Sequence, residues 1–406
     1  MIVGESTGSA NSSVRAGFAL YPSQWMGGRI YLRNLFAALR TLPGSPIVPV
    51  LFTGQRNDNA AGEFPDTEIV HTPLLDRMTP AWFVRKVIAK TTSQDILLRN
   101  LLQRQSISIV SHSFQLGFEP GTRSAIKTIG WIADFQHVHL PEFFTPEECR
   151  LRDRQFESIC GTFDKVIVSS ECARADLRAV LPRYAHKAEL LRFVASPPAT
   201  DEAASLAELQ RLYGFEGPYF LLPNQFWAHK NHRVVLTALR ELKRQGRPYL
   251  VLATGATKDY RNPAFFPSLM KYAEDCGVQD WFRVLGQIPF GHLAGLMRHA
   301  VAFINPSQFE GWSTSVEEAK SMGKQMVLSD LPVHREQAPR RGLYFPPQDA
   351  EALAVAMTTA YDRFEAGSDE EEQEAARVRF PERQRAFGEA YLQIVQRTLE
   401  DRAVSI

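Results

Sequence analysis

The sequence predicts an α/β protein built from two doubly wound, Rossmann-like domains that face each other across a cleft. Short apolar or β-branched runs alternate with longer amphipathic segments, which is the pattern of repeated strand–helix units. Such units cross over with a constant hand and produce parallel sheets. The alternation pauses once near the middle of the chain, and 406 residues correspond to two or three domains. We therefore expect two domains in series.

The first domain is predicted over residues 1–195. Apolar runs bounded by polar or turn residues predict buried strands at residues 15–20, 47–52, 106–111, 127–132 and 165–169. Helical periodicity lies between and after them, at residues 29–42, 82–105, 145–160 and 172–181. This order is the one expected of βαβ units on a parallel sheet.

The domain boundary is predicted at residues 194–204, where paired prolines and small polar residues disfavour both a helix and a central strand. A linker over 196–213 then leads to a second domain over 214–380. Its predicted strands are 219–222, 249–253, 281–285, 302–304 and 325–328, and its predicted helices are 231–245, 266–276, 291–299 and 314–322.

The end of the chain is predicted to be helical beyond residue 349, with a charged break at residues 368–374 and a further amphipathic segment at 381–397. The acidic run in this break is interpreted as a solvated face or loop, because it lies between two helical patterns and is not terminal.

Composition excludes several classes of protein. The 46 basic and 45 acidic side chains nearly balance, so no nucleic-acid partner is expected. The four cysteines form no C-x-x-C pair, which disfavours a zinc ribbon or a disulfide framework and favours a reducing cytoplasm. Residues 1–13 are polar and no apolar run is long enough to span a bilayer. We expect a cytoplasmic protein whose membrane contact, if any, is peripheral at the inner face.

Missing motifs narrow the chemistry. The sequence has no Walker A motif, no G-x-G-x-x-G after a strand, no H-E-x-x-H, and no D-x-D that could hold a divalent cation against a diphosphate. Kinases, dehydrogenases, zinc proteases and metal-dependent transferases are therefore disfavoured.

The most informative segment is residues 301–329, where a strand ends at Asn305, a turn carries Glu310 to Ser313, and a helix begins near Thr314. A turn and a helix N-terminus leave backbone N–H groups without partners, which suits a phosphate. Glu318, one turn into the helix, could accept hydrogen bonds from ribose hydroxyls. Both Thr314-x-x-Glu317 and Ser315-x-x-Glu318 also fit a capping box, which favours capping or solvent for Glu317 and leaves both interpretations open for Glu318.

The spacing Glu310-x7-Glu318, preceded by Pro306-Ser307, resembles the E-x7-E signature of retaining, GT-B-fold glycosyltransferases of family 4. The resemblance implies that Glu310 approaches the donor sugar, that the amides of Gly311, Trp312, Ser313 and Thr314 hold the diphosphate, and that Glu318 binds the ribose. It also implies an N-terminal acceptor domain, a C-terminal nucleotide-sugar domain, and a last helix over residues 381–406 that packs back on the first domain.

A second segment, residues 223–232, supports this resemblance. The family carries an arginine and, five residues later, a lysine, which neutralise the donor diphosphate in place of a metal ion. Lys230 matches the lysine, but Gln225 stands where the arginine is expected. His229, His232 or Arg233 are the sequence-based candidates to replace the missing charge, and Gln225 can still donate a hydrogen bond.

Two segments of the first domain also resemble the family. Gly27 and Gly28 match its glycine turn, although an ordinary strand-to-helix turn explains them equally well. Asp134 matches the aspartate of its acceptor-side histidine–aspartate pair, whereas Ala133 replaces the histidine, so His137 or His139 would supply the imidazole. The two histidines would share a face of an extended segment, and a polar role in the cleft is favoured over metal binding because no third ligand is spaced suitably.

Residues 77–127 carry an excess of basic side chains, and within 77–90 these alternate with Met78, Trp82, Phe83 and Val87. This pattern fits either a surface that contacts an anionic bilayer or, as the favoured alternative, an amphipathic helix that packs its aromatic face on the sheet.

Together, these features predict a retaining, metal-independent glycosyltransferase of the hexosyltransferase type, in polysaccharide or glycolipid biosynthesis. Glu310, Lys230, His137 and Asp134 are the predicted catalytic residues. The co-substrate would be a nucleoside-diphosphate sugar and the acceptor a glycan or a lipid-linked glycan, with no cofactor. The alternatives are a nucleotide-sugar 2-epimerase on the same fold and a non-catalytic protein that binds nucleotide sugars or glycans.

Overall fold

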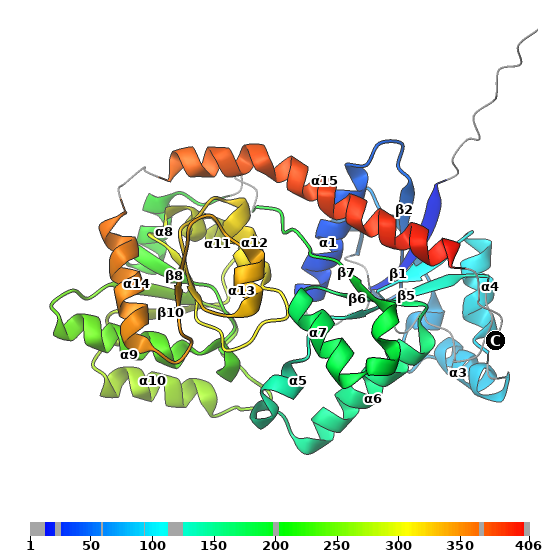
Figure 1. Ribbon diagram of the computed structural model, residues 1–406, viewed down its shortest axis with the longest axis horizontal. Coiled ribbons are helices and arrows are strands. Elements are labelled where there is room, and N and C mark those ends of the chain that lie inside the picture. Colours follow the sequence, from blue (N-terminus) through cyan, green and yellow to red (C-terminus); the bar gives the residue numbers. More distant parts are fainter. Residues whose placement is uncertain are drawn as a thin grey trace, which may run out of the picture.

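The computed structural model describes residues 13–20, 26–57, 60–92, 94–112, 125–197, 203–364 and 369–401. It shows two α/β domains side by side, joined by a last helix that runs along both of them (Figure 1). Each domain is a parallel sheet covered by helices on both faces. The predicted fold class, two doubly wound Rossmann-like domains, is confirmed.

The first domain has a seven-stranded sheet in the order β3-β2-β1-β4-β5-β6-β7. Its strands are β1 (Val14–Leu20), β2 (Ile47–Thr53), β3 (Glu68–His71), β4 (Ile109–Ser111), β5 (Lys127–Ile132), β6 (Lys165–Val168) and β7 (Ala188–Leu190). Its helices are α1 (Met26–Arg40), α2 (Ala60–Glu63), α3 (Pro80–Thr92), α4 (Ile96–Arg104), α5 (Gln136–His139), α6 (Pro146–Thr162) and α7 (Glu171–Val180), with 3₁₀ turns η1 (Pro73–Leu75), η3 (Pro141–Phe143) and η4 (Pro182–Lys187).

The second domain has a six-stranded sheet in the order β10-β9-β8-β11-β12-β13. Its strands are β8 (Tyr219–Leu222), β9 (Leu250–Thr254), β10 (Phe282–Gly286), β11 (Phe303–Asn305), β12 (Met326–Ser329) and β13 (Gly342–Phe345). Its helices are α8 (Leu206–Tyr213), α9 (His232–Arg244), α10 (Phe265–Asp275), α11 (Phe290–His299), α12 (Thr314–Ser321), α13 (Pro332–Gln337) and α14 (Ala350–Asp362), with the 3₁₀ turn η6 (Ala228–Lys230).

The second sheet is buried between two apolar layers. Residues of α9, α10 and α14 form one core with one face of the sheet, and residues of α8, α11 and α12 form another with the opposite face. Strands buried on both faces are expected to be continuously apolar, as β8 and β9 are. The predicted linker therefore includes α8, which packs on this domain; residues 198–202 lie outside the described part of the chain.

The last helix, α15 (Glu370–Glu400), connects the two domains (Figure 1). Phe387, Tyr391, Ile394 and Val395 belong to the core of the first domain, and Gly388 lies against the carbonyl of Ala38 in α1. The charged break predicted at 368–374 is wrong for residues 370–374, which form the first turns of this helix. Glutamates stabilise a helix N-terminus through its dipole, so an acidic run is compatible with a helix start.

The helix predicted over residues 82–105 is in fact two helices, because Asp95 accepts a hydrogen bond from the amide of Leu98 and starts α4. The favoured packing of α3 is also wrong. Its inward face carries Ala89 and Arg85, and Arg85 forms a buried ion pair with Asp95 at 2.7 Å. Phe83 and Val87 are instead 47% and 60% exposed.

Candidate active site

Lys230 and Glu310 lie at the point where the strand order of the second sheet reverses. From β8 the chain proceeds outward through β9 and β10 on one side, and β11 to β13 lie on the other. Lys230 follows β8 and Glu310 follows β11, so both lie beyond the carboxyl ends of adjacent parallel strands. Open α/β sheets bind ligands in the crevice at such a switch point.

The two side chains form an ion pair. Lys230 Nζ lies 2.6 Å from Glu310 Oε1, and the side chains are 15% and 9% exposed. Burial acts to raise the pKa of Glu310, but Lys230, His334 and the hydroxyl of Ser307 outweigh it and lower the pKa to about 2. Glu310 is therefore ionised at neutral pH, and it holds the lysine at the crevice.

Asn305 organises the turn between β11 and α12. It is fully buried, its amide nitrogen donates to Ser313 Oγ at 3.0 Å, and its carbonyl oxygen accepts from Ser307 Oγ at 2.7 Å. Ser307 Oγ also lies 2.7 Å from Glu310 Oε1, so its single proton is shared between these two acceptors. The sequence predicts that Asn305 ends a strand, but no motif marks it as a site residue. The available signal was a polar residue that ends an otherwise apolar strand.

The turn presents unpaired amide groups. In the part of the chain that the structure describes, the N–H groups of residues 311–316 have no acceptor within the protein. Gly311 lies where any side chain would clash with the carbonyl oxygen of Ala133, so this position requires glycine. Residues 310–312, 314 and 315 keep partial solvent exposure. The arrangement leaves an anion-binding site at the start of α12.

Glu318 lies one turn into α12 and is 8% exposed. Among the described residues its carboxylate has no hydrogen-bond or ion-pair partner, and burial raises its pKa to about 7. The capping alternatives for Glu317 and Glu318 are wrong, because the helix start at Ser313 has no side-chain capping bond. Glu317 is buried instead and pairs with Arg383 of α15 at 2.5 Å. Glu318 is therefore a buried acceptor left without a partner.

None of the suggested replacements for the missing arginine supplies a charge to the crevice. Burial lowers the pKa of His229 well below its usual range and that of His232 to about 3, so both are neutral. Arg233 stacks on the ring of Tyr272 on α10, 3.7 Å from its centroid. Gln225 itself accepts a hydrogen bond from the amide of Ala256 at 3.1 Å.

Arg261 is a further cation near the crevice that was not among the residues predicted from the sequence. Its side chain is 10% exposed, and its buried Nε lies 3.5 Å from Asp259 Oδ1 and has no hydrogen-bond partner among the described residues. It lies over the rings of Phe144 and Trp227 at 5.0 and 5.3 Å. No motif marks this residue, because it reaches the site from the loop after β9.

Arg261 lines a cavity of about 340 Å³ between the domains. Its walls come from residues 142–145 and 148 of the first domain and from residues 228, 229 and 259–262 of the second. His229, which precedes Lys230, contributes one wall. The cavity therefore lies next to the segment that carries Lys230 and is lined by both domains.

The acceptor-side residues of the first domain are placed as follows. His137 and His139 lie in the short helix α5, so the prediction that they share an extended face is wrong. His137 is buried and pairs with Asp153 at 3.0 Å, whereas His139 pairs with Asp176 at 2.8 Å. Asp134 accepts from Arg152 at 2.5 Å. His139 stacks on Phe309, next to Glu310, with 5.2 Å between ring centroids.

The crevice turn also contacts the first domain directly. Gly311 packs against Ala133 and Asp134, and Trp312 Nε1 donates to the carbonyl of Phe193 at 3.1 Å. Gly27 and Gly28 lie in the first turn of α1, not in a loop before it; residues 21–25 are outside the described ranges. The structure thus brings Asp134, His139 and the 310–314 turn together.

The fold and this site define a class of protein. Residues 214–374 match the family model described as "Glycosyl transferases group 1". That match covers the sheet and the crevice of the second domain. With two Rossmann-like domains, the chain has the GT-B architecture of these glycosyltransferases.

Similar proteins carry related names. The O-antigen chain mannosyltransferase RfbU of Salmonella typhimurium is 29% identical over 140 residues, 34% of this chain and 37% of that protein. The O-antigen chain mannosyltransferase B of Escherichia coli is 22% identical over 217 residues, 53% of this chain and 56% of that protein. The matched segments thus span about a third and about half of these relatives.

Solved structures share the whole fold. A glycosyltransferase from Rickettsia africae has a TM-score of 0.65 at 16% identity, covering 96% of this chain and 100% of that one. Anabaena Alr3699/HepE in complex with UDP and glucose has a TM-score of 0.65 at 13% identity, covering 95% and 100%.

Proposed function

We propose that this protein is a retaining, metal-independent hexosyltransferase that moves a sugar from a nucleoside diphosphate to a glycan acceptor. The observation that carries the proposal is the 311–316 turn, whose unpaired amides lie beside Lys230 at the switch point of the second sheet. The names of the two relatives make a mannosyl donor and a surface-polysaccharide acceptor the first candidates.

Glu318 binds the ribose of the donor in this proposal. It is a buried carboxylate without a protein partner, one turn from the amides that would hold the diphosphate. Two vicinal hydroxyls would satisfy both oxygens and favour the ionised form. Glu310 orients the sugar, since its oxygen already receives bonds from Lys230 and Ser307.

Transfer breaks the bond between the anomeric carbon and the β-phosphate oxygen, and the acceptor hydroxyl forms the new bond to that carbon. The acceptor proton passes to the departing diphosphate. Negative charge grows on the leaving oxygen, where the turn amides and Lys230 are already in place. Arg261 supplies the second positive charge that Gln225 lacks, because its guanidinium group lines the cavity beside the same crevice.

The acceptor would enter from the first domain, in the cavity between residues 142–148 and the second domain. His139 stacks on Phe309 and borders this side, while His137 is held by Asp153 and positions the α5 turn. Asp134 acts as a positioning residue through Arg152 and its contact with Gly311. Domain closure over the donor would exclude water and limit its hydrolysis.

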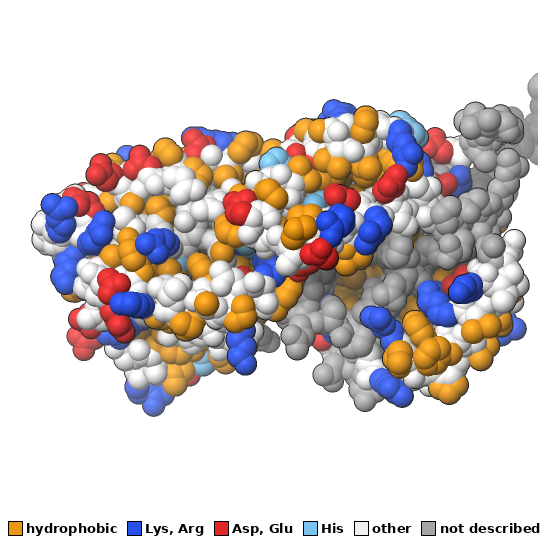
Figure 2. All heavy atoms as spheres, turned by 90° about the horizontal axis from the view of Figure 1, so that it is seen from below, with side chains coloured by type: hydrophobic (Ala, Val, Ile, Leu, Met, Phe, Trp, Pro, Cys, Tyr) orange, Lys and Arg blue, Asp and Glu red, His pale blue; other side chains and the backbone are white. Residues whose placement is uncertain are grey.

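A peripheral membrane contact through α3 would bring the enzyme to a lipid-linked acceptor. Met78, Phe83, Val84 and Val87 are exposed next to the exposed cations Arg77, Lys86 and Lys90. Figure 2 shows hydrophobic and basic side chains mixed on the end of the first domain where α3 lies. Apolar side chains flanked by cations favour an anionic bilayer surface. Among the described residues no helix has the length and hydrophobicity needed to cross a bilayer.

The test is to incubate the protein with a panel of nucleotide sugars and measure free nucleoside diphosphate, with and without glycan acceptors. A transferase releases the diphosphate with one donor, faster when the acceptor is present. An epimerase converts the donor without consuming an acceptor, and a binding protein releases nothing. Either of these outcomes refutes the proposal.

A further inference from the structure

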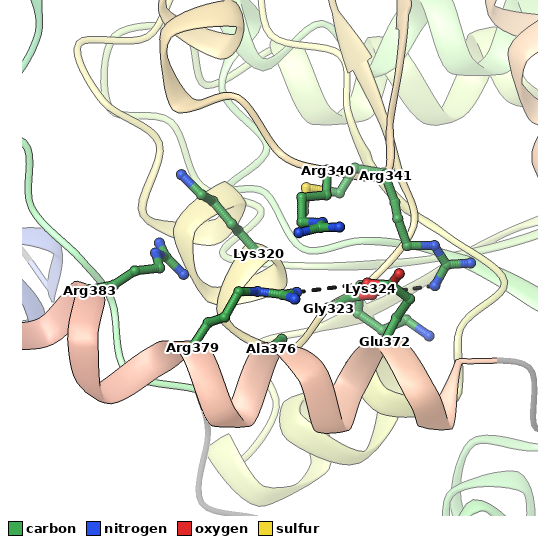
Figure 3. A pocket seen from close by; sticks show the side chains of 10 residues that line it. Lys320, Gly323, Lys324, Arg340, Arg341, Glu372, Ala376, Arg379 and Arg383 are labelled. Carbon is green, nitrogen blue, oxygen red and sulfur yellow. Dashed lines mark hydrogen bonds and ion pairs between the residues drawn. The ribbon is translucent and has the colours of Figure 1, made fainter.

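A second cavity, of about 180 Å³, lies behind α12, between that helix, the start of β13 and the first turns of α15. Basic side chains dominate its walls: Lys320, Lys324, Arg340, Arg341, Arg379 and Arg383. Figure 3 shows that they come from α12 and the turn after it, the loop before β13, and α15, with Arg340 and Arg379 nearest the middle of the group. Glu372 is the acidic residue among its lining residues.

The structure keeps these elements close together. Gly323 has φ +69°, and a side chain there would clash with the carbonyl oxygen of Glu372 at the start of α15. A glycine is required both by this left-handed conformation and by this contact. This contact fixes the position of α15 against the end of α12, and these two helices form two walls of the cavity.

Among the described residues, nearby carboxylates neutralise half of the charge. Asp369 pairs with Lys324 and Arg341, and Glu317 pairs with Arg383 and Lys320. With Glu372, the six cations face three carboxylates in the described part of the chain. Clustered like charges repel one another unless an anion compensates them.

Two of the six cations lack a strong partner. Arg340 is exposed and has no ion pair or hydrogen bond among the described residues. Arg379 reaches Glu372 only at 3.7 Å, beyond hydrogen-bond distance. Lys324, in contrast, is 1% exposed and donates to the carbonyls of Arg298 and Ala300. The guanidinium groups of Arg340 and Arg379 both lie in the space above α15 (Figure 3).

We propose that this cavity is a second anion site, distinct from the donor crevice, that binds a phosphoryl-bearing ligand between Arg340 and Arg379. Guanidinium groups match the oxygens of a phosphoryl group in pairs, and two of them compensate a doubly charged anion. The ligand could be a soluble phosphorylated metabolite or the phosphate of a lipid headgroup, which share this chemistry.

The site touches the helix on which the proposed function depends. Arg383 and Lys320 line the cavity and also hold Glu317, which precedes Glu318. An anion that draws Arg383 away would loosen the support of α12. This consequence rests on the proposed function, whereas binding of the anion does not.

The experiment titrates inorganic pyrophosphate into the full chain by calorimetry, comparing wild type with Arg340→Gln/Arg379→Gln. Arg211→Gln is the matched control, since Arg211 is exposed on α8 and has no ion pair among the described residues. We expect the double variant to lose at least tenfold in affinity at one site. The control keeps both sites, and Arg340→Lys/Arg379→Lys recovers part of the binding. Melting curves verify that all variants fold.

Two further experiments distinguish this cavity from the donor crevice and a soluble ligand from a lipid headgroup. Lys230→Ala should remove the donor-crevice site and leave the second one. Vesicles containing phosphatidylglycerol should bind wild type better than the double variant if the phosphate belongs to a lipid, and pyrophosphate should then displace them. Equal vesicle binding by both proteins, with the difference in pyrophosphate binding retained, assigns the site to a soluble ligand. Equal pyrophosphate binding by wild type and the double variant overturns the proposal, whatever the donor assay shows.

Discussion

Replacing Glu318 with glutamine separates its effect on stability from its effect on ligand binding. The carboxyl group is buried without a partner, and burial raises its pKa to about 7. In the unfolded chain its pKa is near the ordinary value of about 4.5. The native state therefore favours the protonated form of this group, and its contribution to stability is full at low pH.

This contribution is lost as the pH rises from the pKa of Glu318 in the unfolded chain to its pKa in the native protein. Above the native pKa the carboxylate must be ionised in a buried position, which destabilises the native state. A shift of this size corresponds to about 2–3 kcal/mol between pH 5 and pH 8. Glutamine is neutral at both values and nearly isosteric with the protonated acid. Without nucleotide, Glu318→Gln should thus be about as stable as wild type at pH 5 and more stable at pH 8.

Urea denaturation at both pH values measures this difference, and Glu351→Gln, an exposed glutamate on α14, is the matched control. Nucleotide affinity should move in the opposite direction, falling by about 1–3 kcal/mol at pH 8 because a charged acceptor of the ribose is lost. A stability difference that is the same at pH 5 and pH 8, or unchanged nucleotide affinity, refutes the reasoning.

Three other predictions concern the crevice and α3. Lys230→Ala should lower kcat by about 10²–10³-fold, measured as diphosphate release, since it removes a cation that stabilises the leaving group; an unchanged kcat excludes this role. Arg261→Gln should weaken donor binding about tenfold, and adding Gln225→Arg should restore it, as roughly 1.4 kcal/mol is at stake; no recovery shows that Arg261 does not replace the arginine. Phe83→Glu/Val87→Glu should abolish sedimentation with anionic vesicles and leave turnover of a soluble acceptor unaltered; retained sedimentation excludes α3 as the contact.

The sequence predicted the central strands of both sheets but missed β3, β7 and β13. All three are edge strands of three or four residues, and most of their side chains are only partly buried. An edge strand covers less of the core and needs no continuous apolar run, so periodicity carries little signal for it. The helix boundaries were missed at Asp95 and at residues 370–374 because capping and dipole effects outweighed composition.

The crevice was easier to predict than its surroundings. Lys230, Glu310 and Glu318 belong to two short segments in which order and spacing carry the signal. Their roles remain predictions, although the structure brings the first two within 2.6 Å. Arg261 and Asn305 could not be assigned from sequence, since one reaches the crevice from a separate loop and the other acts through hydrogen bonds. The histidines beside Lys230 were suggested as charges because burial cannot be read from their spacing.

The central claim is that the turn after β11 binds a diphosphate together with Lys230. A crystal structure of the protein with a nucleoside diphosphate, chosen by the thermal shift that UDP, GDP, ADP or dTDP produces, tests it most directly. We predict the β-phosphate within hydrogen-bond distance of the amides of residues 311–314 and of Lys230 Nζ, with the ribose hydroxyls on Glu318. A diphosphate bound away from this turn contradicts the account.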